Sequence, residues 1–179
     1  MQFDLLISGG HVVDPTADYD GRLDVGIARG RVVAVEPSLA GHTAAQMLDA
    51  SGTYVFPGLI DLHTHVFHGV GYFGIDADSV AWRSGVTTWV DAGSAGAFTV
   101  PGFREYVIER ASARILAFIA ISYMGMPGLN YDEYANVETC NEEVLARAVD
   151  ANRDVVVGIP RCRNLLIATG SMNCGLPSP

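Results

Sequence analysis

Short apolar runs alternate with turn-forming residues along the first 56 positions of the chain. The runs at 5–7, 11–13, 23–27 and 31–35 are separated by glycine, proline, serine and aspartate. This spacing is typical of short strands joined by tight turns. We therefore predict a small all-β module at residues 1–56, built from β-hairpins.

From residue 57 the pattern changes to strand-like runs that alternate with helix-like ones. The predicted strands are 59–65, 87–90, 115–121 and 155–159. Such a βαβ rhythm requires parallel strands with right-handed crossovers. It is compatible with an open doubly wound sheet or with about the first four strands of a (β/α)₈ barrel.

Two of the connecting helices have recognisable signals. Phe103, Tyr106 and Val107 are spaced so that they share one apolar helical face. A second helix is predicted after Thr139, whose hydroxyl would cap the first turn while Glu142 reaches back in a capping box. Residues 160–179 break the pattern, and we assign this aberrant tail no structure.

Composition and charge narrow the class of protein. With 49% hydrophobic and 17% charged residues, the 179-residue chain has the composition of a globular α/β domain. A formal net charge of −9 disfavours nucleic acid and anionic membrane as partners, because phosphate binding requires a clustered positive face. The longest apolar stretch is too short to span a bilayer. No basic-then-apolar leader opens the sequence, and the three cysteines form no close pair, so we expect a cytoplasmic protein.

The clearest candidate for chemistry is the segment Pro57–His65, in which a Pro-Gly turn leads into a strand that ends in two histidines. Residues i and i+2 of a strand face the same side, so Asp61, His63 and His65 are predicted to project together. Two imidazoles at a strand end can share one metal ion, at roughly 2.0–2.1 Å from each nitrogen if the ion is zinc. Asp61 would fix the tautomer of a ring by accepting its second N–H. The alternative is that both histidines are solvated strand-end residues.

Pro57–His65 resembles the first-strand metal signature of the amidohydrolase superfamily, and the preceding 56 residues resemble the amino-terminal β-sandwich segment of that family. Residues 85–96 and 102–108 are similar to its amidohydrolase/deacetylase branch, which lies near the dihydroorotases. The resemblance covers residues 1–159. It implies a β-sandwich segment at 1–56, followed at 57–159 by the first half of a TIM (β/α)₈ barrel metallohydrolase domain.

In this family His63 and His65 would hold one of two divalent metal ions, which we expect to be zinc. The resemblance further implies a carboxylated lysine that bridges the two ions, two later histidines, and an aspartate that acts as general acid and base. Substrates of this branch are N-acyl or O-acyl compounds. His68, just past the histidine pair, and Ser94, in the turn after the second strand, would then face the substrate. The alternatives are a solvated loop histidine and a tight turn that needs small residues.

One departure from the family pattern concerns the bridging lysine. It would follow the strand at 155–159, where this chain has Pro160, and the sequence contains no lysine. After Ile159 there is also no histidine and no acidic residue. We therefore expect a truncated and impaired hydrolase. The alternatives are a catalytically inactive remnant that binds at most one metal ion, and a half-barrel completed by a partner chain. Unpaired sheet edges would favour homo-oligomers or aggregation.

Overall fold

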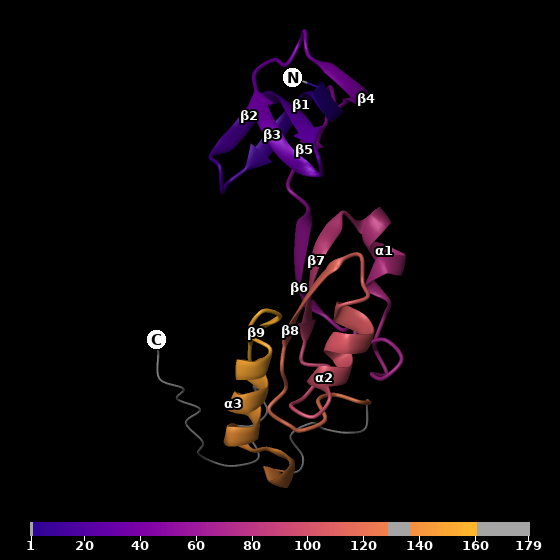
Figure 1. The fold of residues 1–179 in the computed structure, drawn as a ribbon, viewed down its shortest axis with the longest axis vertical. Helices are drawn as coiled ribbons and strands as arrows, with labels where there is room; N and C mark the ends of the chain where they lie inside the picture. Colours follow the sequence, from indigo (N-terminus) through magenta and orange to yellow (C-terminus); the bar gives the residue numbers. More distant parts are fainter. Residues whose placement is uncertain (1, 129–136, 161–179) are drawn as a thin grey trace. The chain divides into compact units, whose positions relative to one another are not determined.

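The computed structural model describes residues 2–128 and 137–160 (Figure 1). Contacts divide the chain into two compact units, Met1–Pro57 and Gly58–Pro179. The division follows Pro57, and the predicted domain boundary follows residue 56. Each unit has its own hydrophobic core.

The first unit is a five-stranded mixed sheet. Its strands are β1 (Gln2–Asp14), β2 (Tyr19–Ala28), β3 (Arg31–Glu36), β4 (Thr43–Asp49) and β5 (Tyr54–Val55). The order is β3-β2-β1-β4, and β5 also pairs with β1. The β1–β2 and β2–β3 pairs are antiparallel hairpins, as predicted, whereas β4 and β5 pair with β1 in parallel.

β1 continues through the Ser8-Gly9-Gly10 segment, where the sequence predicts a turn. Its register with β2 shifts between Ile7 and Gly10, which marks a β-bulge in a continuous strand. Gly9 has a φ of +74°, and a Cβ atom added there would lie 2.7 Å from Ser51 Oγ. Glycine adopts this conformation without steric cost. The predicted turn is therefore wrong, because the two glycines bend one strand instead of separating two.

The second unit is built on a four-stranded parallel sheet in the order β6-β7-β8-β9. Its strands are β6 (Leu59–Thr64), β7 (Val86–Ala92), β8 (Arg114–Phe118) and β9 (Val156–Gly158). Each of these strands falls within or overlaps a run predicted from the sequence. Their parallel pairing agrees with the predicted βαβ rhythm.

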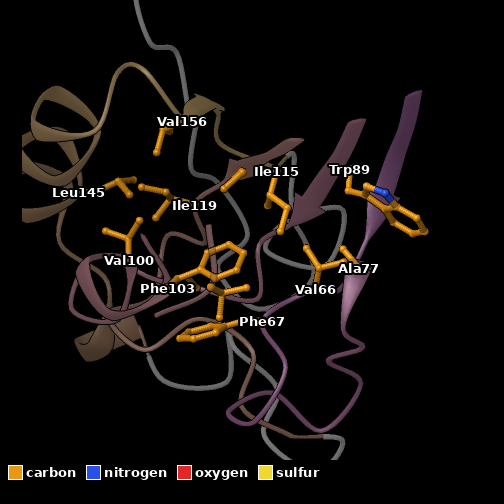
Figure 2. Close-up of a cluster of buried hydrophobic side chains, with 13 residues drawn as sticks. Val66, Phe67, Ala77, Trp89, Val100, Phe103, Ile115, Ile119, Leu145 and Val156 are labelled. Atoms are coloured by element: carbon orange, nitrogen blue, oxygen red, sulfur yellow. The ribbon is translucent and has the colours of Figure 1, made fainter. Parts of the chain in front are cut away.

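Helical segments connect these strands and complete the core of the second unit. They are α1 (Ala77–Ser84), α2 (Val100–Phe103), the π-helix η1 (Arg104–Ile108), the 3₁₀-helix η2 (Val137–Thr139) and α3 (Glu142–Ala151). Figure 2 shows the buried side chains, among which the rings of Phe67 and Phe103 lie 4.6 Å apart between centroids. Trp89, Ile115 and Val156 contribute from β7, β8 and β9. None of the helices in the described ranges is long and apolar enough to cross a membrane.

The helical face predicted from Phe103, Tyr106 and Val107 is only partly correct. Phe103 and Val107 are buried, but Tyr106 is 58% exposed. The π-helical turn explains the difference, because hydrogen bonds from residue i+5 to residue i change which residues share a face. One such bond runs from the Glu109 N–H to the Arg104 carbonyl at 2.9 Å.

The cap of α3 is Asn141, so the predicted cap at Thr139 is wrong. The side-chain oxygen of Asn141 accepts the Val144 N–H at 3.0 Å. Asn141 directly precedes the first helical residue, Glu142, and has the extended conformation of an N-cap, with φ −147°. Thr139 instead ends the preceding 3₁₀-helix η2.

Candidate metal-binding site

β6 carries the two candidate histidines to the carboxyl edge of the parallel sheet. Asp61 is in register with Trp89 of β7, and the next registered pair is Thr64 with Asp91. A step of three residues in β6 therefore matches a step of two in β7, which is a bulge. The simple two-residue alternation predicted for this segment is interrupted at that point.

Asp61 lies just before this bulge and binds the backbone. Its Oδ1 accepts the N–H of His63 at 3.1 Å. An aspartate that binds the backbone two residues further on stabilises a local turn of the chain. The predicted role of Asp61 toward a metal-bound ring stays a prediction.

The imidazoles of His63 and His65 are neighbours. Their ring centroids lie 5.8 Å apart and their planes meet at 82°. At metal–nitrogen distances of about 2.0–2.1 Å, each ring centre would lie roughly 3 Å from a bound ion. Two such distances add up to about the observed separation, which is therefore the spacing expected of two rings that share one cation. His63 is exposed and His65 is half-buried, which leaves the pair accessible from solvent.

His65 has the more enclosed position. Its Nδ1 lies 2.9 Å from Ser94 Oγ, and its ring centroid lies 5.9 Å from that of Phe73. Burial lowers the pKa of the His65 imidazole below its ordinary value of 6.5, the charge of Asp91 opposes this shift, and His63 adds to it. The imidazole is therefore neutral at neutral pH, which is the form that binds metal ions.

Asp91 is the buried carboxylate of the site. It is 0% exposed. Its Oδ2 accepts the Val66 N–H at 2.8 Å, and its Oδ1 accepts the N–H groups of Gly93 at 3.1 Å and Ser94 at 2.7 Å. Asp91 is not among the site residues predicted from the sequence. The signal was an acidic residue directly after the apolar pair Trp89 and Val90 near the end of a strand, where a polar side chain is costly to bury without partners.

The other two candidate residues lie in different surroundings. Ser94 is buried and contacts His65, so the structure brings it to the imidazole pair. His68 instead lines a cavity of about 230 Å³ whose lining includes Asp76, Tyr106 and Arg110 but neither histidine of the pair. That Ser94 and His68 face a substrate stays a prediction.

Pro160 follows β9 near the loop that carries Ser94. A Cβ atom added to Gly93 would lie 3.1 Å from Pro160 Cγ. The position at which the family resemblance implies a lysine is therefore next to the β7 end of the site. Within residues 2–128 and 137–160, no group of three or more His, Cys, Asp or Glu side chains is arranged to hold a metal ion. The candidate donors are therefore the two neighbouring imidazoles of His63 and His65.

Comparison with known proteins identifies the relatives of this chain. Deacetylase Atu3266 of Agrobacterium fabrum is 34% identical over 143 residues. The crystal structure of a dihydroorotase superposes with a TM-score of 0.77 at 29% identity, and that of an adenine deaminase with 0.74 at 28%. The chain is homologous to the amino-terminal part of amidohydrolase-superfamily proteins. No family model matches it.

This amidohydrolase homologue spans much less than the full length of its relatives. The match to the deacetylase covers 79% of the chain and 35% of the relative. The matches to the dihydroorotase and adenine deaminase structures cover 87% and 88% of the chain, but 41% and 40% of those chains. Its mixed α/β fold is similar to that of amidohydrolase TIM-barrel proteins.

Proposed function

We propose that His63 and His65 supply two ligands of a divalent cation in a metal-dependent hydrolase site of the amidohydrolase/deacetylase type. The single observation that carries this proposal is the pair of adjacent imidazoles, 5.8 Å apart between centroids, at the carboxyl end of β6. Catalytic sites of barrel enzymes lie at this end of the strands. Under this proposal the four-stranded sheet is the first part of a TIM barrel.

The proposed cation is zinc, and the proposed substrates are small N-acyl or O-acyl compounds in the cytoplasm. When bound, such a cation would supply the Lewis acidity that polarises an acyl carbonyl and lowers the pKa of water to about 7. His63 and His65 would hold it as neutral nitrogen donors. The homology to a protein named as a deacetylase supports this substrate class.

A second candidate function is a site that binds one cation and turns over little or no substrate by itself. Two observations favour it: Pro160 occupies the position next to Gly93 where a lysine is implied, and the sequence contains no lysine. Catalytic zinc usually has three protein ligands, so two imidazoles leave its coordination incomplete. A partner chain that provides the missing ligands would restore activity.

Zinc uptake and turnover of four proteins test both candidates. Bound zinc is counted after dialysis, and a panel of N-acetyl amino acids and acetyl esters is assayed with the wild type, His63→Ala/His65→Ala, and the matched control His11→Ala/His42→Ala. We expect zinc uptake to be lost only in the first double variant. Equal uptake by all three proteins would contradict the proposed site. Pro160→Lys is the fourth protein, and it is assayed in the same way. Zinc-dependent turnover of the substrate panel by the wild type would reject the second candidate function, a site that binds one cation and turns over little or no substrate.

A further inference from the structure

We propose that a cavity in the second unit binds a small organic carboxylate with a short apolar chain. The cavity has a volume of about 230 Å³, and its lining comes from α1, η1 and the start of β8. Neither His63 nor His65 lines it, so this inference does not depend on the proposed metal site. One molecule of liquid water takes up about 30 Å³, so the cavity has room for a ligand of about seven non-hydrogen atoms.

The buried part of the cavity lining is apolar. Ala77, Val107 and Ile115 line the cavity and are only 2%, 5% and 3% exposed. All three belong to the hydrophobic core of the second unit. A hydrocarbon chain placed against them would leave water, which favours binding. The lining therefore favours a ligand with an apolar part over a fully polar one.

Arg110 brings a positive charge to the same cavity. Its Nε donates to the Glu105 carbonyl oxygen at 3.2 Å, and its guanidinium carbon lies over the Tyr106 ring, 5.3 Å from the centroid. Among the residues that the structure describes, the terminal amino groups of Arg110 have no acceptor. A guanidinium that is held at its Nε and its face offers paired N–H groups, which match the two oxygens of a carboxylate.

The two aspartates at the cavity already accept backbone hydrogen bonds. Asp78 accepts the N–H groups of Ser112 and Ala113, both at 2.7 Å, and Asp76 accepts the N–H of Asp78 at 3.1 Å. In the described part of the second unit neither aspartate forms an ion pair with Arg110, although all three residues line the cavity. Two acidic side chains disfavour an anion with several charges, such as phosphate, because like charges repel. A single carboxylate is therefore the anion that suits this cavity.

NMR titration of the zinc-free full chain with isovalerate tests this inference. Isovalerate joins one carboxylate to a branched apolar chain, acetate lacks the chain, and isoamylamine has the chain but a positive head group. The variants are Arg110→Met, which keeps the apolar part of the side chain, and Ala111→Leu, which fills part of the cavity. The matched control is Arg83→Met, since Arg83 also lies over a ring, that of Trp82 at 5.4 Å, but does not line the cavity.

We expect isovalerate to shift the amide signals of Ala77 and Val107 until they saturate. Arg110→Met should weaken this binding about tenfold or more, because the bonds to a charged group are lost. Acetate should bind about tenfold or more weakly than isovalerate, because its apolar part is smaller. Ala111→Leu should also weaken binding, whereas Arg83→Met should not.

Three results would overturn the inference: no saturable shift in the wild type, equal binding of isoamylamine, or wild-type affinity in Arg110→Met. If Arg110→Met fails to fold, wild-type affinity in Ala111→Leu would overturn it instead. Zinc uptake is measured separately on the same protein. Binding of isovalerate without any zinc uptake would keep this inference and reject the proposed metal site.

Discussion

The Oδ2 atom of Asp91 lies 2.8 Å from the backbone nitrogen of Val66, a residue 25 positions earlier in the sequence. This bond ties the segment after β6 to the end of β7. Because the same carboxylate also holds the Gly93 and Ser94 N–H groups, it joins the two loops that carry the candidate site. The candidate site is therefore organised by one buried carboxyl group.

Replacement of the Asp91 carboxyl group should lower the stability of the second unit. Asp91→Ala leaves three backbone N–H groups without their acceptor, and each buried unsatisfied donor costs about 1–3 kcal/mol. We expect the free energy of unfolding of the second unit to fall by roughly 3 kcal/mol or more. Urea unfolding followed by tryptophan fluorescence measures this unit alone, since Trp82 and Trp89 are the only tryptophans in the sequence. As a control, Asp49→Ala, an exposed aspartate of the first unit, should leave the curve unchanged. A loss of less than about 1 kcal/mol in Asp91→Ala would contradict this assignment.

Trp89 offers a second stability test. Its Nε1 is buried and has no hydrogen-bond partner within the described part of the chain. Trp89→Phe removes this unsatisfied donor and keeps most of the apolar surface, so we expect it to cost less than about 1.5 kcal/mol, whereas Trp89→Ala should cost about 3–5 kcal/mol. Thermal unfolding monitored by circular dichroism compares the two variants. Equal losses in the two variants would contradict the expectation that Trp89 contributes stability through the packing of its ring and not through its N–H.

The sequence predicts the order of elements well, because apolar runs and Gly or Pro residues mark strand ends locally. The closeness of the His63 and His65 rings to each other also follows from their local spacing in the sequence. Asp91 was not found, since its importance depends on the distant N–H of Val66. Adjacent polar residues also compete for one role, as Asn141 caps α3 where Thr139 was predicted. Local patterns therefore predict elements better than the bonds between them.

Acid should weaken the contact between α1 and the segment before β8. The N–H groups of Ser112 and Ala113 both donate to Asp78 at 2.7 Å, and these bonds lower the pKa of the Asp78 carboxyl below its ordinary value of 3.8. A carboxyl whose pKa is lower in the folded chain contributes stability above pH 3.8, and this contribution is lost as the pH falls through the folded-state pKa. We expect Asp78→Asn to be less stable at neutral pH and to lose less stability on acidification. Urea unfolding between pH 6 and 3 checks this, with Asp150→Asn as an exposed control. Parallel pH profiles for wild type and Asp78→Asn would argue against this role.

Introduction of a lysine at Pro160 tests what the family resemblance implies for the end of β9. Pro160→Lys places an amine that carbon dioxide can carboxylate beside the Gly93 loop. We expect tighter zinc binding that depends on added bicarbonate, because a carboxylated lysine supplies a further ligand. Pro160→Arg is the matched control, since it brings the same positive charge without a carboxylatable amine. Isothermal titration with and without bicarbonate distinguishes them, and an equal response of both variants would count against the implied position.

Zinc titration of the metal-free chain, followed through the histidine ring signals, tests the central claim most directly. If His63 and His65 share one cation, their signals should move together and saturate at one zinc ion per chain, while those of His11 and His42 stay unchanged. Movement of only one ring of the pair, or an equal response from the histidines of the first unit, would contradict the proposed site.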